Sequence, residues 1–249
     1  MPYIESICKA GKTIEVERYY TSRYGCKGQK RSDKVKPTPE EQKKINDKLA
    51  EKKLRRLINE NFSAGDYHLV LSYQKKKGEP NRDPEEMKED IRKFLRALRK
   101  EYKLQGQDLK YIHVAEVGQR GARHHHLILN AIPPDTIQGC WPHGRIHINP
   151  LDISGNYREL ASYLVKQTSK LLKTEAELQG KRWNSSKNLR HPEPEKRIIT
   201  ERAWYRSEAK VPAKYRGRYV IDPDSISMGV TSAEYYGYGY FRFTMVMLC

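Results

Sequence analysis

The sequence has no long hydrophobic run, and this absence argues against a protein built on membrane-spanning helices. Its apolar stretches, such as YHLVLSY and HHHLILNAI, are shorter than the ~18 apolar residues of a membrane span but long enough for buried strands. The first residues, MPYIESICKAGK, lack the apolar segment of a signal peptide. We therefore expect a folded protein without a membrane partner that stays in the cytoplasm where it is made.

Closely spaced cysteines are also missing. The four cysteines stand at positions 8, 26, 140 and 249 and form no CxxC pair. A secreted disulfide scaffold or a zinc ribbon needs closer, paired spacing. We expect reduced thiols, as in a cytoplasmic protein.

Acidic residues are few relative to basic ones. The chain has 31 Asp and Glu against 48 Lys and Arg, which gives a formal net charge of +17. This charge indicates a polyanionic partner, nucleic acid before anionic membrane, although a basic surface that only maintains solubility is the alternative. Phenylalanine is scarce, with 4 residues, whereas the 17 tyrosines suit either base stacking on a single strand or a β-rich core.

A nucleotide-binding loop is not recognisable. Gly11-Lys12-Thr13 matches only the end of the phosphate-loop motif, because Ser6 stands where the motif needs its first glycine and we expect no strand before it. No helicase module is visible either, so strand separation falls to a different protein.

Capping motifs and residue periodicity predict an α+β fold with a central, mostly antiparallel sheet and helices on one of its faces. Thr38-Pro39-Glu40-Glu41 and Asp83-Pro84-Glu85-Glu86 are typical helix starts with capping boxes. The N-terminal helix has an apolar stripe formed by Ile45, Leu49, Leu54, Leu57 and Ile58. The expected strands are 12–24, 66–74, 109–117, 124–132 and 144–151, with helices over 38–61, 83–102 and 156–178, a polar linker over 181–196, and short strands in the last fifty residues.

These elements suggest three regions. Residues 1–64 supply a strand and an amphipathic helix, residues 65–178 form the core domain, and residues 179–249 form a basic, Tyr-rich β extension.

Two histidines on one expected strand form a candidate metal site. Residues two apart on a strand point to the same face, so His124 and His126 present neighbouring imidazoles while His125 points away. Two imidazoles and a third ligand make a metal site with open positions for water or substrate. A histidine triplet without a metal is the alternative.

Glu116, on the preceding strand, is the candidate third ligand. If the connecting loop is 118–122, Glu116 pairs with His124 and the three side chains converge. If the loop is one residue shorter, Glu116 faces the other side of the sheet, since a one-residue slip reverses every side chain. A carboxylate with two imidazoles favours Mg or Mn over a closed zinc site, and a surface glutamate beside a turn is the alternative.

Tyr163 heads the polar face of the last expected helix. Lys166, Gln167 and Lys170 follow it at helical spacing, next to the apolar positions Leu160, Leu164 and Leu171. Taken alone, such a tyrosine is more typical of a core edge than of a catalytic group. Its combination with the histidine pair and Glu116 favours a catalytic tyrosine instead.

Together, YIHVAEVGQRGARHHHLIL (111–129) and YLVKQ (163–167) resemble the HUH endonucleases, specifically rolling-circle replication initiators. In that family an acidic residue and a glycine turn precede two metal-binding histidines separated by one residue, and a later helix carries a catalytic tyrosine with a lysine three residues on. The segment LVLSY (69–73) is similar to the family's first motif. His125 stands where the family generally has an apolar residue, which leaves ligation through His125 open.

The resemblance implies an HUH/RRM-like sheet domain that nicks and rejoins single-stranded DNA to start rolling-circle replication in a bacterial cytoplasm. His124, His126 and Glu116 then hold Mg or Mn, Tyr163 attacks a phosphate to give a 5′-phosphotyrosyl intermediate and a free 3′-hydroxyl, and Lys166 assists. The implied partners are single-stranded DNA with an origin hairpin and the host helicase and polymerase.

Other functions remain open. A relaxase or a single-tyrosine transposase uses the same chemistry, although relaxases usually place the histidines after the tyrosine. A non-catalytic, basic, metal-stabilised nucleic-acid-binding protein predicts salt-sensitive DNA binding without a covalent product, and a structural RNA-binding protein predicts a preference for RNA.

Overall fold

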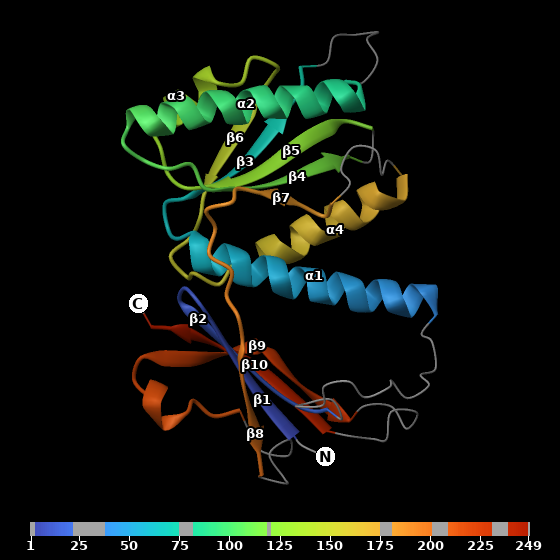
Figure 1. The fold of residues 1–249 in the computed structure, drawn as a ribbon, viewed down its shortest axis with the longest axis vertical. Coiled ribbons are helices and arrows are strands. Elements are labelled where there is room, and N and C mark those ends of the chain that lie inside the picture. The colour runs from blue at the N-terminus through green and yellow to red at the C-terminus, as the bar shows by residue number, and fades with distance from the viewer. Residues whose placement is uncertain are drawn as a thin grey trace. The chain divides into compact units, whose positions relative to one another are not determined.

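The computed structural model describes residues 3–21, 38–74, 82–118, 121–174, 181–200, 209–230 and 239–248. The chain forms two compact units: unit 1 consists of residues 1–42, 154–156 and 191–249, and unit 2 of residues 43–153 and 157–190. Each unit contains one five-stranded antiparallel sheet (Figure 1). The α+β fold predicted from the sequence is confirmed, and the three-region division stays a prediction.

The sheet of unit 1 joins the two ends of the chain. The hairpin of β1 (Tyr3–Ala10) and β2 (Thr13–Tyr20) lies in the middle of this sheet, because β1 also pairs with β8 (Glu195–Ile199) and β2 also pairs with β10 (Gly239–Met247). Strand β9 (Tyr219–Val230) pairs with β10 and forms one edge of the sheet. A short 3-10 helix, Ala213–Tyr215, precedes β9.

The sequence-based expectation for the N-terminus was wrong in one respect, since strand β1 precedes Gly11. Side chains on both faces of β1 are buried, including Ile4, Glu5 and Ser6. The strand therefore lacks the apolar–polar alternation by which a half-buried strand is recognised. The phosphate-loop motif is still excluded, because Ser6 stands where the motif needs its first glycine.

Unit 2 contains the second sheet and four helices. Its strands are β6 (Ile146–Pro150), β3 (Tyr67–Ser72), β5 (Arg123–Leu129), β4 (Tyr111–Val117) and β7 (Asn184–Ser185), in that order across the sheet. The helices are α1 (Pro39–Asn61), α2 (Pro84–Leu104), α3 (Pro134–Gly139) and α4 (Arg158–Thr174). Two features were not expected: the short helix α3, and strand β7 within the segment expected to be a polar linker.

Helices cover both faces of this sheet, and not one face as expected (Figure 1). On the first face, α1 and α4 pack against apolar side chains of β4 and β5, such as Val114 and Ile128. On the second face, α2 and α3 pack against residues of β3 and β5, such as Leu69 and Leu127. The consecutive apolar residues of β5 fit this arrangement, because a strand covered on both faces needs no alternation.

Helix α1 departs from the expected packing along its first half. Leu54, Leu57 and Ile58 are buried, but Ile45 and Leu49 are 45% and 58% exposed. A helix of this length extends ~35 Å, whereas the strands that it covers extend only ~20 Å. The first turns of α1 therefore reach beyond the sheet of unit 2.

Within the described ranges, no helix combines the length and apolar composition that a membrane crossing requires.

Candidate active site

The register of the β4–β5 hairpin decides which side chains meet. Glu116 pairs with His124 and Val117 with Arg123, so the loop comprises residues 118–122. Gly121 in this loop has a φ of 74°, a left-handed conformation that glycine adopts without steric cost. Of the two registers that the sequence left open, the structure has the one that places Glu116, His124 and His126 on the same face.

His126 is the centre of a polar cluster on this face, which consists of His68, Glu116, His124, His126 and Tyr163. Its side chain is 3% exposed, and its Nε2 is hydrogen-bonded to Oε2 of Glu116. Its other ring nitrogen, Nδ1, lies 3.2 Å from Nε2 of His68, and the two imidazoles stack with centroids 5.4 Å apart. Both ring nitrogens of His126 are thus engaged, one by a carboxylate and the other by an imidazole.

Tyr163 reaches the same cluster from α4. Its hydroxyl donates a hydrogen bond of 3.3 Å to Oε2 of Glu116, and its ring contacts that of His126 edge to face at 5.4 Å. The side chain is 39% exposed, so the phenol is partly accessible to a large substrate. Two segments that are far apart in the sequence therefore contribute to one polar cluster.

The charges in the cluster affect Glu116 and Tyr163 in opposite ways. Burial alone raises the pKa of Glu116, but the hydrogen bond from His126 and the nearby imidazoles outweigh burial, so that its pKa is lowered. Burial and the adjacent Glu116 carboxylate both raise the pKa of Tyr163. In the arrangement seen here the carboxylate is ionised and the phenol is protonated.

His124 lies on the face of the sheet that carries the cluster, whereas Lys166 lies outside the cluster. His124 is half-buried, and burial lowers its pKa although the charge of Glu116 acts in the opposite direction. Lys166 is exposed on α4 and, among the described residues, makes no polar contact with Glu116, His126 or Tyr163. Tyr157, the other tyrosine near this helix, is 4% exposed and donates its hydroxyl hydrogen bond to the carbonyl of Asp152.

The donor atoms suit a divalent cation in type, but they are bonded to one another. Within the described part of the chain, no three His, Cys, Asp or Glu side chains are placed to hold a metal ion. Nε2 of His126 faces Glu116 instead of a shared central point. The ligand set His124, His126 and Glu116 stays a prediction, and metal binding requires rotation of these side chains.

His125 points to the opposite face of the sheet, toward α2. Its Nε2 lies 2.9 Å from the hydroxyl of Tyr73, and its Nδ1 lies 3.0 Å from Nε2 of His113. Burial lowers the pKa of His125 well below its ordinary value. His125 is therefore a neutral, hydrogen-bonded residue of the interior, on the face away from His124 and His126.

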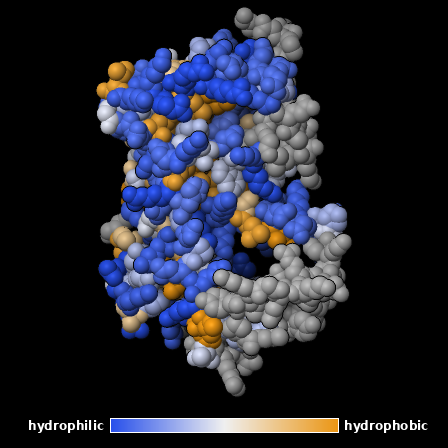
Figure 2. All heavy atoms as spheres, viewed as in Figure 1, coloured by the Kyte–Doolittle hydropathy of each residue, from blue (hydrophilic) through white to orange (hydrophobic). Residues whose placement is uncertain are grey.

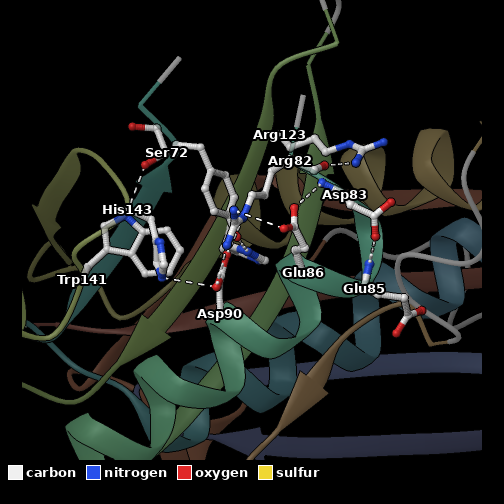
Figure 3. Close-up of polar contacts among 11 residues, drawn as sticks. Ser72, Arg82, Asp83, Glu85, Glu86, Asp90, Arg123, Trp141 and His143 are labelled. Atoms are coloured by element: carbon white, nitrogen blue, oxygen red, sulfur yellow. Dashed lines mark hydrogen bonds and ion pairs between the residues drawn. The ribbon is translucent and has the colours of Figure 1, made fainter. Parts of the chain in front are cut away.

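Asp90 anchors the polar contacts on this second face (Figure 3). It accepts hydrogen bonds from Arg82, with Nε at 2.9 Å, and its other oxygen lies 3.3 Å from Nε2 of His143. Nearby, the indole of Trp141 donates to the carbonyl of Ser72. These contacts tie α2 and the segment after α3 to the end of β3.

His68 is the residue of the cluster that the sequence analysis missed. It lies on β3, where it pairs with Ile128 of β5. Burial lowers its pKa to about 4, and the neighbouring His126 adds to this effect. His68 lies two residues before Val70, which pairs with His126, so His68 and His126 are on the same face of the sheet. The sequence indicates this relation only when the pairing of β3 with β5 is already known.

A family model matches the part of the chain that contains this cluster. Residues 66–172 match the family model described as Replication-associated protein ORF2/G2P. This stretch includes β3, the β4–β5 hairpin and most of α4, and so every residue of the cluster. No curated protein and no solved structure shows a significant match. Through residues 66–172 the chain is therefore similar to the Replication-associated protein ORF2/G2P family, a family of phage rolling-circle replication initiators.

Proposed function

We propose that this protein starts phage rolling-circle replication by nicking one DNA strand at the origin and later rejoining it, with Tyr163 as the nucleophile. The family implies a role in replication initiation and binding to origin DNA. The observation that carries the catalytic proposal is the hydrogen bond between the Tyr163 hydroxyl and Glu116, beside His126. A partly exposed phenol held against a carboxylate and an imidazole is suited to nucleophilic attack.

In this reaction the phenol of Tyr163, which is 39% exposed, gives up its proton to solvent water. Oη of Tyr163 then attacks the phosphorus of a DNA phosphate, and the bond to the 3′ oxygen breaks. The 3′ oxygen takes up a proton and leaves as a hydroxyl, while the 5′ phosphate stays bound to Tyr163. Attack of a 3′-hydroxyl on this linkage restores a phosphodiester and frees the tyrosine, so that no ATP is required for rejoining.

Glu116 and the two imidazoles are the candidate ligands for Mg or Mn. A divalent cation supplies charge neutralisation at the scissile phosphate and offsets the carboxylate charge that raises the pKa of Tyr163. Without the cation, Glu116 accepts the hydrogen bond of the phenol and so orients it, and His68 lies against Nδ1 of His126.

Lys166 is the candidate cation for the substrate. It is exposed one turn beyond Tyr163 on α4, where its ammonium group can contact a DNA phosphate without contacting the cluster. We assign it to stabilising the phosphate, not to activating the phenol.

The test is a denaturing-gel assay with labelled single-stranded origin DNA and Mn or Mg. We expect wild type to form a protein-linked DNA band that a chelator abolishes. Tyr163→Phe removes the attacking oxygen, so we expect no band at all. Tyr157→Phe is the matched control, because it removes a hydroxyl that is buried against Asp152, and it should retain the band.

Three results contradict the proposal in different ways. If Tyr163→Phe still forms the adduct, the nucleophile is another tyrosine. If Lys166→Ala cleaves as fast as wild type, Lys166 has no part in the mechanism. If wild type binds every substrate but never becomes linked to DNA, the protein is a non-catalytic nucleic-acid-binding protein.

A further inference from the structure

The outer surface of α2 carries a dense stripe of positive charge. Between residues 92 and 103 the helix has six cations and a single acidic residue, Glu101. All six cations are exposed, and Figure 2 shows hydrophilic residues over much of the visible face of this helix. The members of this cationic stripe are Arg92, Lys93, Arg96, Arg99, Lys100 and Lys103.

Four of these cations form one row along the helix. Arg92, Arg96, Arg99 and Lys103 follow one another at intervals of four, three and four residues, which places them on the same side of an α-helix. At a rise of ~1.5 Å per residue, the row extends for about 17 Å. The buried side of the helix carries Ile91, Phe94, Leu98 and Tyr102, so α2 itself lies between this row and the sheet.

The stripe is unfavourable for the isolated protein. Like charges at i and i+4, such as Arg92 with Arg96 and Arg96 with Lys100, destabilise a helix by a few tenths of a kcal/mol per pair. Among the described residues, Arg92 forms an ion pair of 3.6 Å with Glu89, and both side chains are exposed. Helix α1 differs, because acidic residues alternate with its lysines. A bound polyanion removes the repulsion along α2.

The features of the stripe favour duplex DNA over a single strand. A single-strand binding surface combines positive charge with exposed aromatic rings on which bases stack. The two aromatic residues of α2, Phe94 and Tyr102, are buried, and its exposed side offers charge but no aromatic ring. A straight, rigid row of cations without a stacking surface suits the regular phosphate backbone of a duplex.

We propose that the cationic stripe of α2 binds the phosphate backbone of duplex DNA, on the side of the unit 2 sheet opposite Tyr163. This inference rests on the proposed function, because the duplex is the double-stranded DNA that adjoins the nicked strand at the origin. The contact is to phosphates and is independent of sequence. It holds the protein on its replicon while the first face of the sheet carries out the chemistry.

The experiment compares two triple variants of the full chain. Arg96→Gln, Arg99→Gln and Lys103→Gln together neutralise the row, and glutamine retains high helix propensity. The matched control removes three exposed lysines of α1 through Lys44→Gln, Lys48→Gln and Lys53→Gln, which gives the same change in net charge. Fluorescence anisotropy measures the affinity for a duplex of two helical turns and for a single strand of equal length, over a series of salt concentrations.

We expect the α2 variant to bind the duplex at least about tenfold more weakly, with the slope of log affinity against log salt reduced by about 2 to 3. The control variant should keep most of the wild-type affinity and slope. Thermal unfolding should occur at an unchanged or higher temperature in the α2 variant, because repulsion along the helix is relieved. Adduct formation on a short single strand should be unchanged, which separates this surface from the active site.

Two outcomes overturn the inference. Equal losses of duplex affinity in the two triple variants mean that net charge alone, and not the stripe, determines binding. A loss of single-strand affinity as large as the loss of duplex affinity means that the stripe does not distinguish the two forms. If wild type forms no adduct on the single strand, the proposed catalytic function fails, while the anisotropy result still decides whether α2 binds duplex DNA.

Discussion

His126 is held from two sides by residues of different strands. Glu116 from β4 is bonded to its Nε2 and His68 from β3 lies against its Nδ1. In metal sites the nitrogen opposite the ligating one usually carries a proton that a second group accepts, and this group fixes the orientation of the ring. His68 has the position for this role if Nε2 of His126 binds the metal.

We therefore predict that His68→Ala weakens Mn binding by about 10- to 100-fold, the usual effect of losing a group that orients a ligand. His68→Gln should restore part of the affinity, because its amide oxygen can accept the proton on Nδ1. His68→Phe keeps the stacked ring but offers no acceptor, and it should behave like alanine. Calorimetric titration with Mn measures the affinity, and adduct formation at saturating Mn should approach the wild-type rate.

An unchanged Mn affinity in His68→Ala would show that His68 serves only the packing of β3 against β5.

At the scale of elements, ion pairs of Glu5 connect three strands of unit 1. Glu5 on β1 is 3% exposed and accepts hydrogen bonds of 2.7 Å from Arg18 on β2 and from Arg197 on β8. Burial by itself raises the pKa of Glu5, but the two guanidinium groups outweigh burial and lower it. The ionised carboxylate therefore stabilises the pairing of β1 with both neighbours.

The pH dependence of stability follows from this lowered pKa. The contribution of Glu5 is complete above its unfolded-state pKa of ~4.3 and is lost as the pH falls through the lower folded-state value. We predict that Glu5→Gln lowers the free energy of unfolding by about 1 to 3 kcal/mol at neutral pH. This difference from wild type should shrink toward zero below pH ~4. Urea unfolding at several pH values measures the effect.

Glu195→Gln is the matched control, because Glu195 is an exposed residue of β8. It should change stability little at any pH, and a constant effect of Glu5→Gln across the acid range would contradict the assignment.

At the scale of the whole molecule, the chain combines two sheets with a net charge of +17. Unit 2 contains the matched family region apart from residues 154–156 and carries the polar cluster. Unit 1 is assembled from both ends of the chain and lies outside this region except for those three residues. A ligand that binds the polar cluster should therefore stabilise unit 2 against unfolding.

We predict that Mn raises the temperature at which wild type unfolds, because a ligand that binds only the folded state adds about 2.7 kcal/mol at a concentration of 100 times its Kd. His126→Ala should lose this increment, since it removes one expected ligand. The exposed His191 provides the control variant His191→Ala, which should keep the increment. Differential scanning calorimetry with and without a chelator measures the shift, and an equal shift in wild type and His126→Ala would argue against a metal at this cluster.

The sequence by itself determined the elements whose signals are local. Capping boxes located the starts of α1 and α2, because a cap is formed by neighbours in the chain. The separation of His124 and His126 placed both on one face of a strand, and the spacing of Tyr163 and Lys166 placed them on one helix. The family resemblance from 111–129 and 163–167 was confirmed by the match over residues 66–172.

Only the tertiary structure decided which of these elements meet. The hairpin register brought Glu116 to His124, the pairing of β3 with β5 brought His68 to His126, and the packing of α4 brought Tyr163 to Glu116. The central position of β1 and the presence of helices on both faces of the unit 2 sheet were likewise hidden from the sequence. Contacts between distant segments depend on how apolar faces fit together, and local periodicity records which residues are apolar but not which surface covers them.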